Sequence, residues 1–271
     1  MTEARAGKMS YGSAGLSDVG RKRTSNEDSF AIDSRNNLYI VADGMGGHAA
    51  GEVASRLAVE SIERHISGSD PRKEPTFPAS MRSLTREEEA LPIPARRVLT
   101  SIRLANQEIV RSVRKDRSMR GMGTTVVIAL IQDDRAYIGS VGDSRVYLMR
   151  GAAMRQLTSD HTFVNEQVMA GAISAEEARR HPARNILTRA VGSQEEVEAD
   201  LIEQDLQNGD ILLLCSDGLT SMAEDTEIHD ALKTAPSSLD TGCKNLVDLA
   251  NSHGGDDNVT VVLVRAGPPG T

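Results

Sequence analysis

Short runs of apolar residues, each ended by turn residues, recur along the chain and predict a β-rich protein. These runs lie at residues 37–42, 124–131, 135–141, 145–150, 211–216 and 258–265. The three runs between 124 and 150 are joined by turns so short that they join antiparallel neighbours, which predicts a meander. Several runs are apolar at successive positions, so we expect strands that are covered on both faces.

Apolar residues spaced three and four apart predict helices that cover these strands. Two such helices lie between residues 53 and 66 and between residues 98 and 113, and a third candidate runs from about 237 to 252. Helices that flank antiparallel strands indicate layers, with sheet packed on sheet and helices outside.

Two segments interrupt this pattern. Residues 68–94 hold five of the nine prolines and predict a surface excursion between two helices. Residues 160–193 are helical in pattern but polar, which is typical of a flap laid over an edge. There is no internal repeat or low-complexity tail, so a single domain over residues 1–271 is the simplest expectation.

Composition excludes several classes of protein. The chain of 271 residues has a formal net charge of −8, is 3% aromatic and contains no Trp, so it lacks the basic surface and stacking groups of a nucleic-acid binder. No apolar run reaches the length of a membrane span, and residues 1–10 lack the apolar region of a secretory signal. Cys215 and Cys243 do not make a disulfide framework, so we expect a cytoplasmic protein with reduced thiols.

The candidate chemistry lies in aspartates at the ends of the apolar runs. Asp43, Asp143 and Asp217 each follow such a run, and Asp257 stands just before the last one. One aspartate there is usually a turn former, but four of them converging in a poorly solvated cleft would repel one another without a cation. Oxygen ligands without a Cys or His cluster favour Mg²⁺ or Mn²⁺ over zinc.

Two further motifs bear on the ligand. The stretch at 44–49 fits the dinucleotide fingerprint G-x-G-x-x-A, but its helix leads into the proline-rich excursion, and Asp43 directly before it would repel a pyrophosphate. We therefore set the nucleotide interpretation aside. Residues 20–29 place arginines next to Glu27 and Asp28, and a guanidinium beside an acidic metal site is suited to gripping two phosphate oxygens.

Taken together, these motifs resemble those of the bacterial PPM family, the metal-dependent (type 2C) protein Ser/Thr phosphatases. The matching segments follow the family's order and lie at residues 17–30, 39–55, 121–127, 138–150, 157–164, 212–222 and 254–264, within about 12–266. The resemblance implies an α+β fold, a four-layer αββα sandwich in which two antiparallel β-sheets are flanked by helices.

The resemblance also implies which residues hold two Mn²⁺ or Mg²⁺ ions. Asp43 resembles the carboxylate that bridges both ions, and Gly44 stands where the family supplies a backbone carbonyl to the second ion. Asp217 and Asp257 resemble ligands of the first ion. Glu27 is similar to the acid that holds the second ion, largely through water.

Other positions are implied in the same way. Arg23 matches the family's phosphate-binding arginine, and Asp143, with Asp217, resembles the third-metal site of bacterial members. Residues 160–190 match the flap beside the active site, which in this family influences substrate choice. Many eukaryotic members have a His directly after the Asp-Gly pair as a proposed general acid. Here Met45 stands in that place, so the general acid stays unassigned.

The activity implied is hydrolysis of phosphoserine and phosphothreonine by in-line attack of a water activated by two metal ions. No phosphoenzyme is needed, so we expect Cys215 to be an inert core thiol, and lone histidines such as His48 and His161 are more often structural. We expect a monomer that acts on phosphoproteins and opposes a bacterial Ser/Thr kinase. Two alternatives stay open: a pseudophosphatase that binds phosphoprotein without turnover, and a phosphatase for small phosphate esters.

Overall fold

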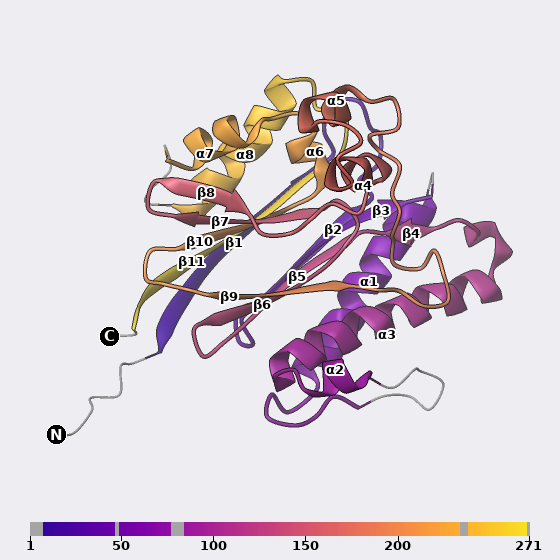
Figure 1. The fold of residues 1–271 in the computed structure, drawn as a ribbon, viewed down its shortest axis with the longest axis vertical. Coiled ribbons are helices and arrows are strands. Elements are labelled where there is room, and N and C mark those ends of the chain that lie inside the picture. The colour runs from indigo at the N-terminus through magenta and orange to yellow at the C-terminus, as the bar shows by residue number, and fades with distance from the viewer. Residues whose placement is uncertain (1–7, 47–48, 77–83, 234–237, 270–271) are drawn as a thin grey trace.

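Two antiparallel β-sheets pack face to face with helices on both outer sides, as Figure 1 shows. The computed structural model describes residues 8–46, 49–76, 84–233 and 238–269. The first sheet has the strand order β2-β3-β5-β6-β9, with β4 paired to β3. Its strands are β2 (Asp28–Asp33), β3 (Leu38–Met45), β4 (Gly123–Thr124), β5 (Val126–Gln132), β6 (Arg135–Val141) and β9 (Asp200–Asp205).

The second sheet has the order β1-β11-β10-β7-β8, so the first and last of the described strands lie side by side. Its strands are β1 (Met9–Asp18), β7 (Arg145–Arg150), β8 (Ala153–Gln156), β10 (Ile211–Cys215) and β11 (Val259–Pro269). The helices are α1 (Ala49–Ser67), α2 (Arg86–Glu89), α3 (Ile93–Lys115), the 3₁₀ turn η1 (Arg117–Met119), α4 (Phe163–Met169), α5 (Ala175–Arg180), α6 (Asp217–Thr220), α7 (Asp225–Lys233) and α8 (Leu239–Ser252).

Three buried layers hold this sandwich together. Strand β3 shows the principle, because Ile40 and Ala42 pack into the core beneath α1 and α3, whereas Tyr39 and Val41 pack into the core between the sheets. A third core joins the other sheet to α6, α7 and α8. The runs are apolar at successive positions because their strands are covered on both faces, as predicted. The expected αββα fold is confirmed.

One topological prediction is wrong. The runs 135–141 and 145–150 coincide with β6 and β7, but these strands are not neighbours in a meander. Strand β6 pairs with β5 and β9, while β7 pairs with β10 and β8 in the other sheet. The turn between them crosses from sheet to sheet, because Ile138 and Val146 both pack into the central core and Gly142 at φ 100° turns the chain.

The irregular segments are partly as expected. Short helix α2 lies within the 68–94 excursion, whose last residues already form the first turn of α3. Part of this excursion (residues 77–83) and His48 lie outside the described residues. The predicted flap consists of α4, α5 and the loops around them. No helix among the described residues is long and apolar enough to cross a membrane.

Candidate active site

The strand-end aspartates come together at one edge of the sandwich, as predicted. Asp43 lies near the end of β3, Asp217 opens α6 just after β10, and Asp257 stands just before β11. Burial raises the pKa of the Asp43 carboxyl well above its usual range. Nearby negative charges raise this pKa further, and they belong to Asp28, Asp217, Asp143 and Asp257.

Asp28 is a member of the cluster that the sequence interpretation missed. It stands directly opposite Asp43 in the pairing of β2 with β3 and is 8% exposed. Its Oδ2 accepts a hydrogen bond of 2.8 Å from the hydroxyl of Ser216, while Oδ1 has no partner among the described residues. Burial raises the pKa of Asp28 to about 7, and the charges of Asp217 and Asp257 act in the same direction.

Asp217 and Asp143 are held in the same low-dielectric environment. Burial, and then the charge of Asp257, raises the pKa of Asp217, whose Oδ1 is buried without a described partner. Burial raises the pKa of Asp143 to about 7, followed by the charges of Asp217 and Asp160. Both groups therefore resist ionisation unless positive charge is supplied.

This donor set fits hard divalent cations. Buried and half-buried carboxylates in mutual repulsion, two of them with a buried oxygen that lacks a described partner, are the arrangement that a cation bound by oxygen ligands would stabilise. No three His, Cys, Asp or Glu side chains in the described part of the chain form a metal cage on their own. Backbone carbonyls and water would therefore have to complete the coordination.

Gly44 and Glu27 lie together beside the cluster. The N–H of Gly44 donates to the backbone carbonyl of Glu27 at 3.1 Å. A Cβ at Gly44 would lie 2.1 Å from the carbonyl oxygen of Gly51, so a larger residue could not occupy this position. A Cβ at Gly51 would likewise lie 1.9 Å from Glu27 Oε2, so the first turns of α1 leave room for the Glu27 carboxylate. Sequence reasoning did not identify Gly51.

Arg23 reaches the cluster from the loop between β1 and β2. Its Nη2 donates to Oδ2 of Asp257 at 2.7 Å, and its side chain is 52% exposed. Buried Asn258 ties this loop to β11, because its Oδ1 accepts from the N–H of Glu27 at 2.8 Å and its Nδ2 donates to two carbonyls of the loop. The guanidinium therefore lies at the open side of the carboxylates.

The flap begins beside the site. Both carboxylate oxygens of Asp160 accept hydrogen bonds from Arg145, with distances of 2.9 Å from Nε to Oδ1 and 2.6 Å from Nη2 to Oδ2. Beyond it, α4 and α5 carry the chain over the surface near α6 (Figure 1), and Arg179 pairs with Glu224 at 3.3 Å. Most of the exposed large hydrophobic residues among those described lie on this segment: Phe163, Met169 and Ile186.

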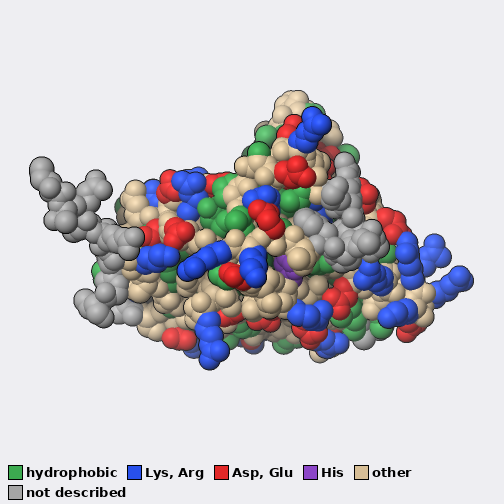
Figure 2. Space-filling view, turned by 90° about the horizontal axis from the view of Figure 1, so that it is seen from below, with side chains coloured by type: hydrophobic (Ala, Val, Ile, Leu, Met, Phe, Trp, Pro, Cys, Tyr) green, Lys and Arg blue, Asp and Glu red, His purple; other side chains and the backbone are tan. Residues whose placement is uncertain are grey.

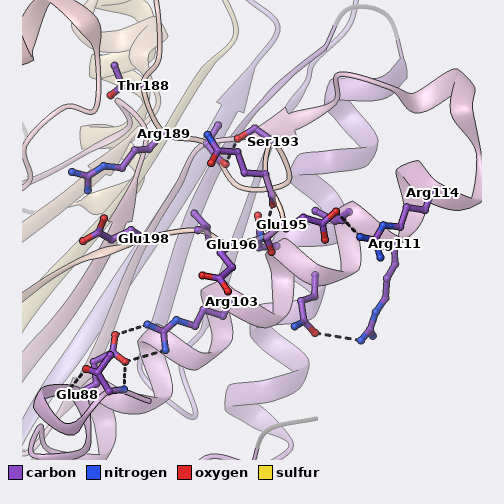
Figure 3. Close-up of a pocket in the computed structure, with 17 residues that line it drawn as sticks. Glu88, Arg103, Arg111, Arg114, Thr188, Arg189, Ser193, Glu195, Glu196 and Glu198 are labelled. Atoms are coloured by element: carbon purple, nitrogen blue, oxygen red, sulfur yellow. Dashed lines mark hydrogen bonds and ion pairs between the residues drawn. The ribbon is translucent and has the colours of Figure 1, made fainter. Parts of the chain in front are cut away.

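Two other surface features, a cavity beside α3 and a charged face, lie away from the strand-end cluster. A cavity of about 800 Å³ opens between α3 and residues 188–198, and Figure 3 shows two ion pairs in its lining, Arg103–Glu88 and Arg114–Glu195. Figure 2 shows basic and acidic side chains interspersed over one face of the molecule. Neither feature offers the carboxylate chemistry of the strand-end cluster.

Comparison with known proteins identifies the family of this chain. Residues 18–249 match the family model described as protein phosphatase 2C. The serine/threonine phosphatase stp of Listeria monocytogenes is 42% identical over 92% of this chain and 93% of its own length. Protein phosphatase PhpP of Streptococcus pneumoniae is 39% identical over 92% of this chain and 95% of its own length.

Solved structures agree with the sequence relatives. The Mycobacterium tuberculosis serine/threonine phosphatase PstP/Ppp has 35% identity and a TM-score of 0.80, covering 95% of this chain and 99% of that one. A structure of the PstP catalytic domain with two manganese ions has 34% identity and a TM-score of 0.80, covering 96% and 99%. The resemblance stated from the motifs is thus confirmed, and the chain belongs to the protein phosphatase 2C family.

Proposed function

We propose that this protein hydrolyses phosphoserine and phosphothreonine in proteins at the strand-end carboxylate cluster. The chain is a metal-dependent serine/threonine phosphatase by family. The observation that carries the assignment to this site is the burial of Asp43 among the other acids, with the half-exposed guanidinium of Arg23 beside them.

The residues that would hold cations there all offer oxygen atoms at the same edge of the sandwich. Asp43, Asp217, Asp257 and Asp143 would hold the ions through their carboxylates, Gly44 through its carbonyl and Glu27 through water. When bound, Mn²⁺ or Mg²⁺ ions supply a nucleophile near neutral pH by lowering the pKa of coordinated water. The two manganese ions in the PstP structure support two core ions and manganese as a suitable metal.

The side chains of this chain bind and orient the phosphoryl group. Arg23 has N–H groups left beyond the one bonded to Asp257, and its planar fork matches two phosphoryl oxygens. Its contact with Asp257 fixes the guanidinium beside the reacting centre, where it offsets the charge spread over those oxygens. Met45 has no proton to give to the leaving oxygen, so we assign that proton to water.

Turnover with purified protein tests this function. We expect Mn²⁺-dependent hydrolysis of a phosphothreonine peptide and of an aryl phosphate, both lost in EDTA. Tight binding of the phosphopeptide without turnover would instead identify a pseudophosphatase. Hydrolysis of aryl phosphate with none of phosphopeptide or phosphoprotein would identify an enzyme for small esters.

We further propose that the flap selects protein substrates through its exposed apolar side chains. Replacing Phe163, Met169 and Ile186 together with serine should lower kcat/KM for a phosphoprotein about tenfold, because removing apolar contacts worth about 1.4 kcal/mol changes binding by that factor. The aryl phosphate is too small to reach the flap and serves as the control substrate. An equal loss with both substrates would contradict the proposal.

The proposed activity also bears on the oligomeric state and the cellular compartment of the protein. We propose a monomer of one phosphatase domain that opposes a bacterial Ser/Thr kinase in the cytoplasm. Its two cysteines, Cys215 and Cys243, are buried and unpaired, which suits a reducing compartment. Analytical ultracentrifugation of the purified protein tests the monomer.

A further inference from the structure

Two adjacent buried threonines enclose the backbone of Asp43. The N–H of Asp43 donates to Oγ1 of Thr125 at 3.0 Å. Its carbonyl accepts from Oγ1 of Thr124 and from the N–H of Thr125, each at 2.8 Å. Thr124 and Thr125 are 0% and 3% exposed, so these bonds form where water does not replace them. The orientation of the Asp43 side chain therefore depends on this pair.

Thr125 also contacts the turn that carries Asp143. Its Oγ1 shares a hydrogen bond of 2.7 Å with Oγ of Ser144, the residue after Asp143. The turn packs on the methyl group as well, because a Cβ at Gly142 would lie 2.6 Å from Thr125 Cγ2. One side chain thus lies between Asp43, on the first sheet, and Asp143, on the crossing to the second.

Both ends of the flap are hydrogen-bonded to the residues next to Asp143 and Thr125. At its start, the N–H of His161 donates to the carbonyl of Gly142 at 2.9 Å, and the N–H of Gly142 donates to Nδ1 of His161 at 3.1 Å. At its end, Val191 and Thr124 exchange two backbone hydrogen bonds of 2.9 and 3.0 Å. His161, expected to be an isolated structural histidine, is therefore a clamp on the turn before Asp143.

We propose that Thr125 is a positioning residue whose hydroxyl sets the backbone of Asp43 relative to the Asp143 turn, and so couples the cation positions to each other and to the flap. This inference rests on the proposed function, because Asp43 and Asp143 are cation ligands only there. The Thr125 hydroxyl bonds to the backbone of Asp43 and to the turn that carries Asp143, and so supports the proposed ligands without being one. Removing a residue with such a supporting role commonly changes metal affinity 10- to 100-fold.

Two substitutions separate this role from simple packing. Thr125→Val keeps the shape and the methyl contact with Gly142 but leaves the N–H of Asp43 without its acceptor. Thr125→Ser keeps the hydroxyl and loses the methyl. If the hydroxyl positions the ligands, valine is the damaging substitution; if the methyl packs the turn, serine is. Thr100→Val is the matched control, because the Thr100 hydroxyl is fully buried without a partner among the described residues.

Isothermal titration of chelator-treated protein with Mn²⁺ measures the effect, with kcat and KM for the phosphopeptide at saturating Mn²⁺ as a second readout. We expect Thr125→Val to weaken Mn²⁺ binding about 10- to 100-fold and to lower kcat more than it raises KM. Thr125→Ser and Thr100→Val should remain close to wild type. Should Thr125→Val fail to fold, Ser144→Ala, which removes the other hydroxyl of the bond, should weaken the lowest-affinity Mn²⁺ step.

Wild-type Mn²⁺ affinity in Thr125→Val, or in Ser144→Ala, overturns the inference, as does a larger loss in Thr125→Ser than in Thr125→Val. These outcomes leave the phosphatase assignment intact. A wild-type protein that takes up no Mn²⁺ and turns over no phosphopeptide overturns the proposed function and the inference with it.

Discussion

Asp217→Ala is expected to lower turnover of a phosphothreonine peptide by about 1,000-fold or more at saturating Mn²⁺ while the protein stays folded. Asp217 is half-buried at the start of α6, its charge raises the pKa of Asp43, and its buried Oδ1 has no partner among the described residues. Alanine removes a proposed ligand of the first ion. Steady-state kinetics over a range of Mn²⁺ concentrations, with circular dichroism for the fold, measure the effect.

Asp210→Ala provides a matched control at the opposite end of β10. Asp210 is buried, at 2% exposed, but it is paired with Arg150 at 2.7 Å and lies outside the cluster. Its removal should cost about 1–3 kcal/mol of stability, since Arg150 is partly solvated, and leave kcat unchanged. Asp217→Ala should not destabilise the chelated protein, because it removes one of several mutually repelling acids. Near-normal turnover in Asp217→Ala would show that the ligand assignment is wrong.

Chelating divalent cations should make the protein lose stability as pH rises from about 5 to 8. Asp28 and Asp143 have a pKa of about 7 in the folded protein, against an ordinary value of 3.8. Between these two pKa values the folded form holds protons that the unfolded chain has released, so raising the pH from 5 to about 7 favours unfolding, and little further stability is lost above that. The free energy of unfolding should fall by a few kcal/mol, because each pKa unit corresponds to about 1.4 kcal/mol.

Urea unfolding at pH 5 and pH 8, in EDTA and in millimolar Mg²⁺, measures this dependence. Cations take over the charge compensation that protons provide at low pH, so Mg²⁺ should restore stability at pH 8 and have little effect at pH 5. Asp143→Asn keeps the shape of one titrating group, and its chelated form should show a smaller pH dependence. A chelated wild type equally stable at both pH values would contradict the charge repulsion described for the cluster.

The sequence predicted those features whose signal is local. Uninterrupted apolar runs gave β6 and β7 their observed bounds, and an acid that directly follows such a run and precedes Gly identified Asp43 and Asp217. Both signals arise because a strand buried on two faces has no polar position until it ends. Strand β1 is rich in Gly and Ser, and strand β9 is acidic. Neither contains an uninterrupted apolar run, so the sequence did not predict them.

The rest depends on pairing between distant segments. Asp28 opens a short strand with no apolar run before it, and its place opposite Asp43 follows from the register of β2 on β3. The contact of Asn258 with Glu27 and the clamp of His161 on Gly142 are likewise set by packing. The crossing between β6 and β7 was missed because turn length fixes strand direction but not which sheet receives the next strand.

The pairing of β1 with β11 has a consequence for the order in which the enzyme becomes active during synthesis. Among the described strands, β1 has no hydrogen-bonded neighbour except β11, and Asp18 of β1 pairs with Val259. The first sheet can form once β9 has left the ribosome, but β1 must wait for the last strand. Asp257 emerges immediately before that strand. Until β11 is available, β1 therefore lacks its partner, and the proposed ligand Asp257 is not held beside the other acids.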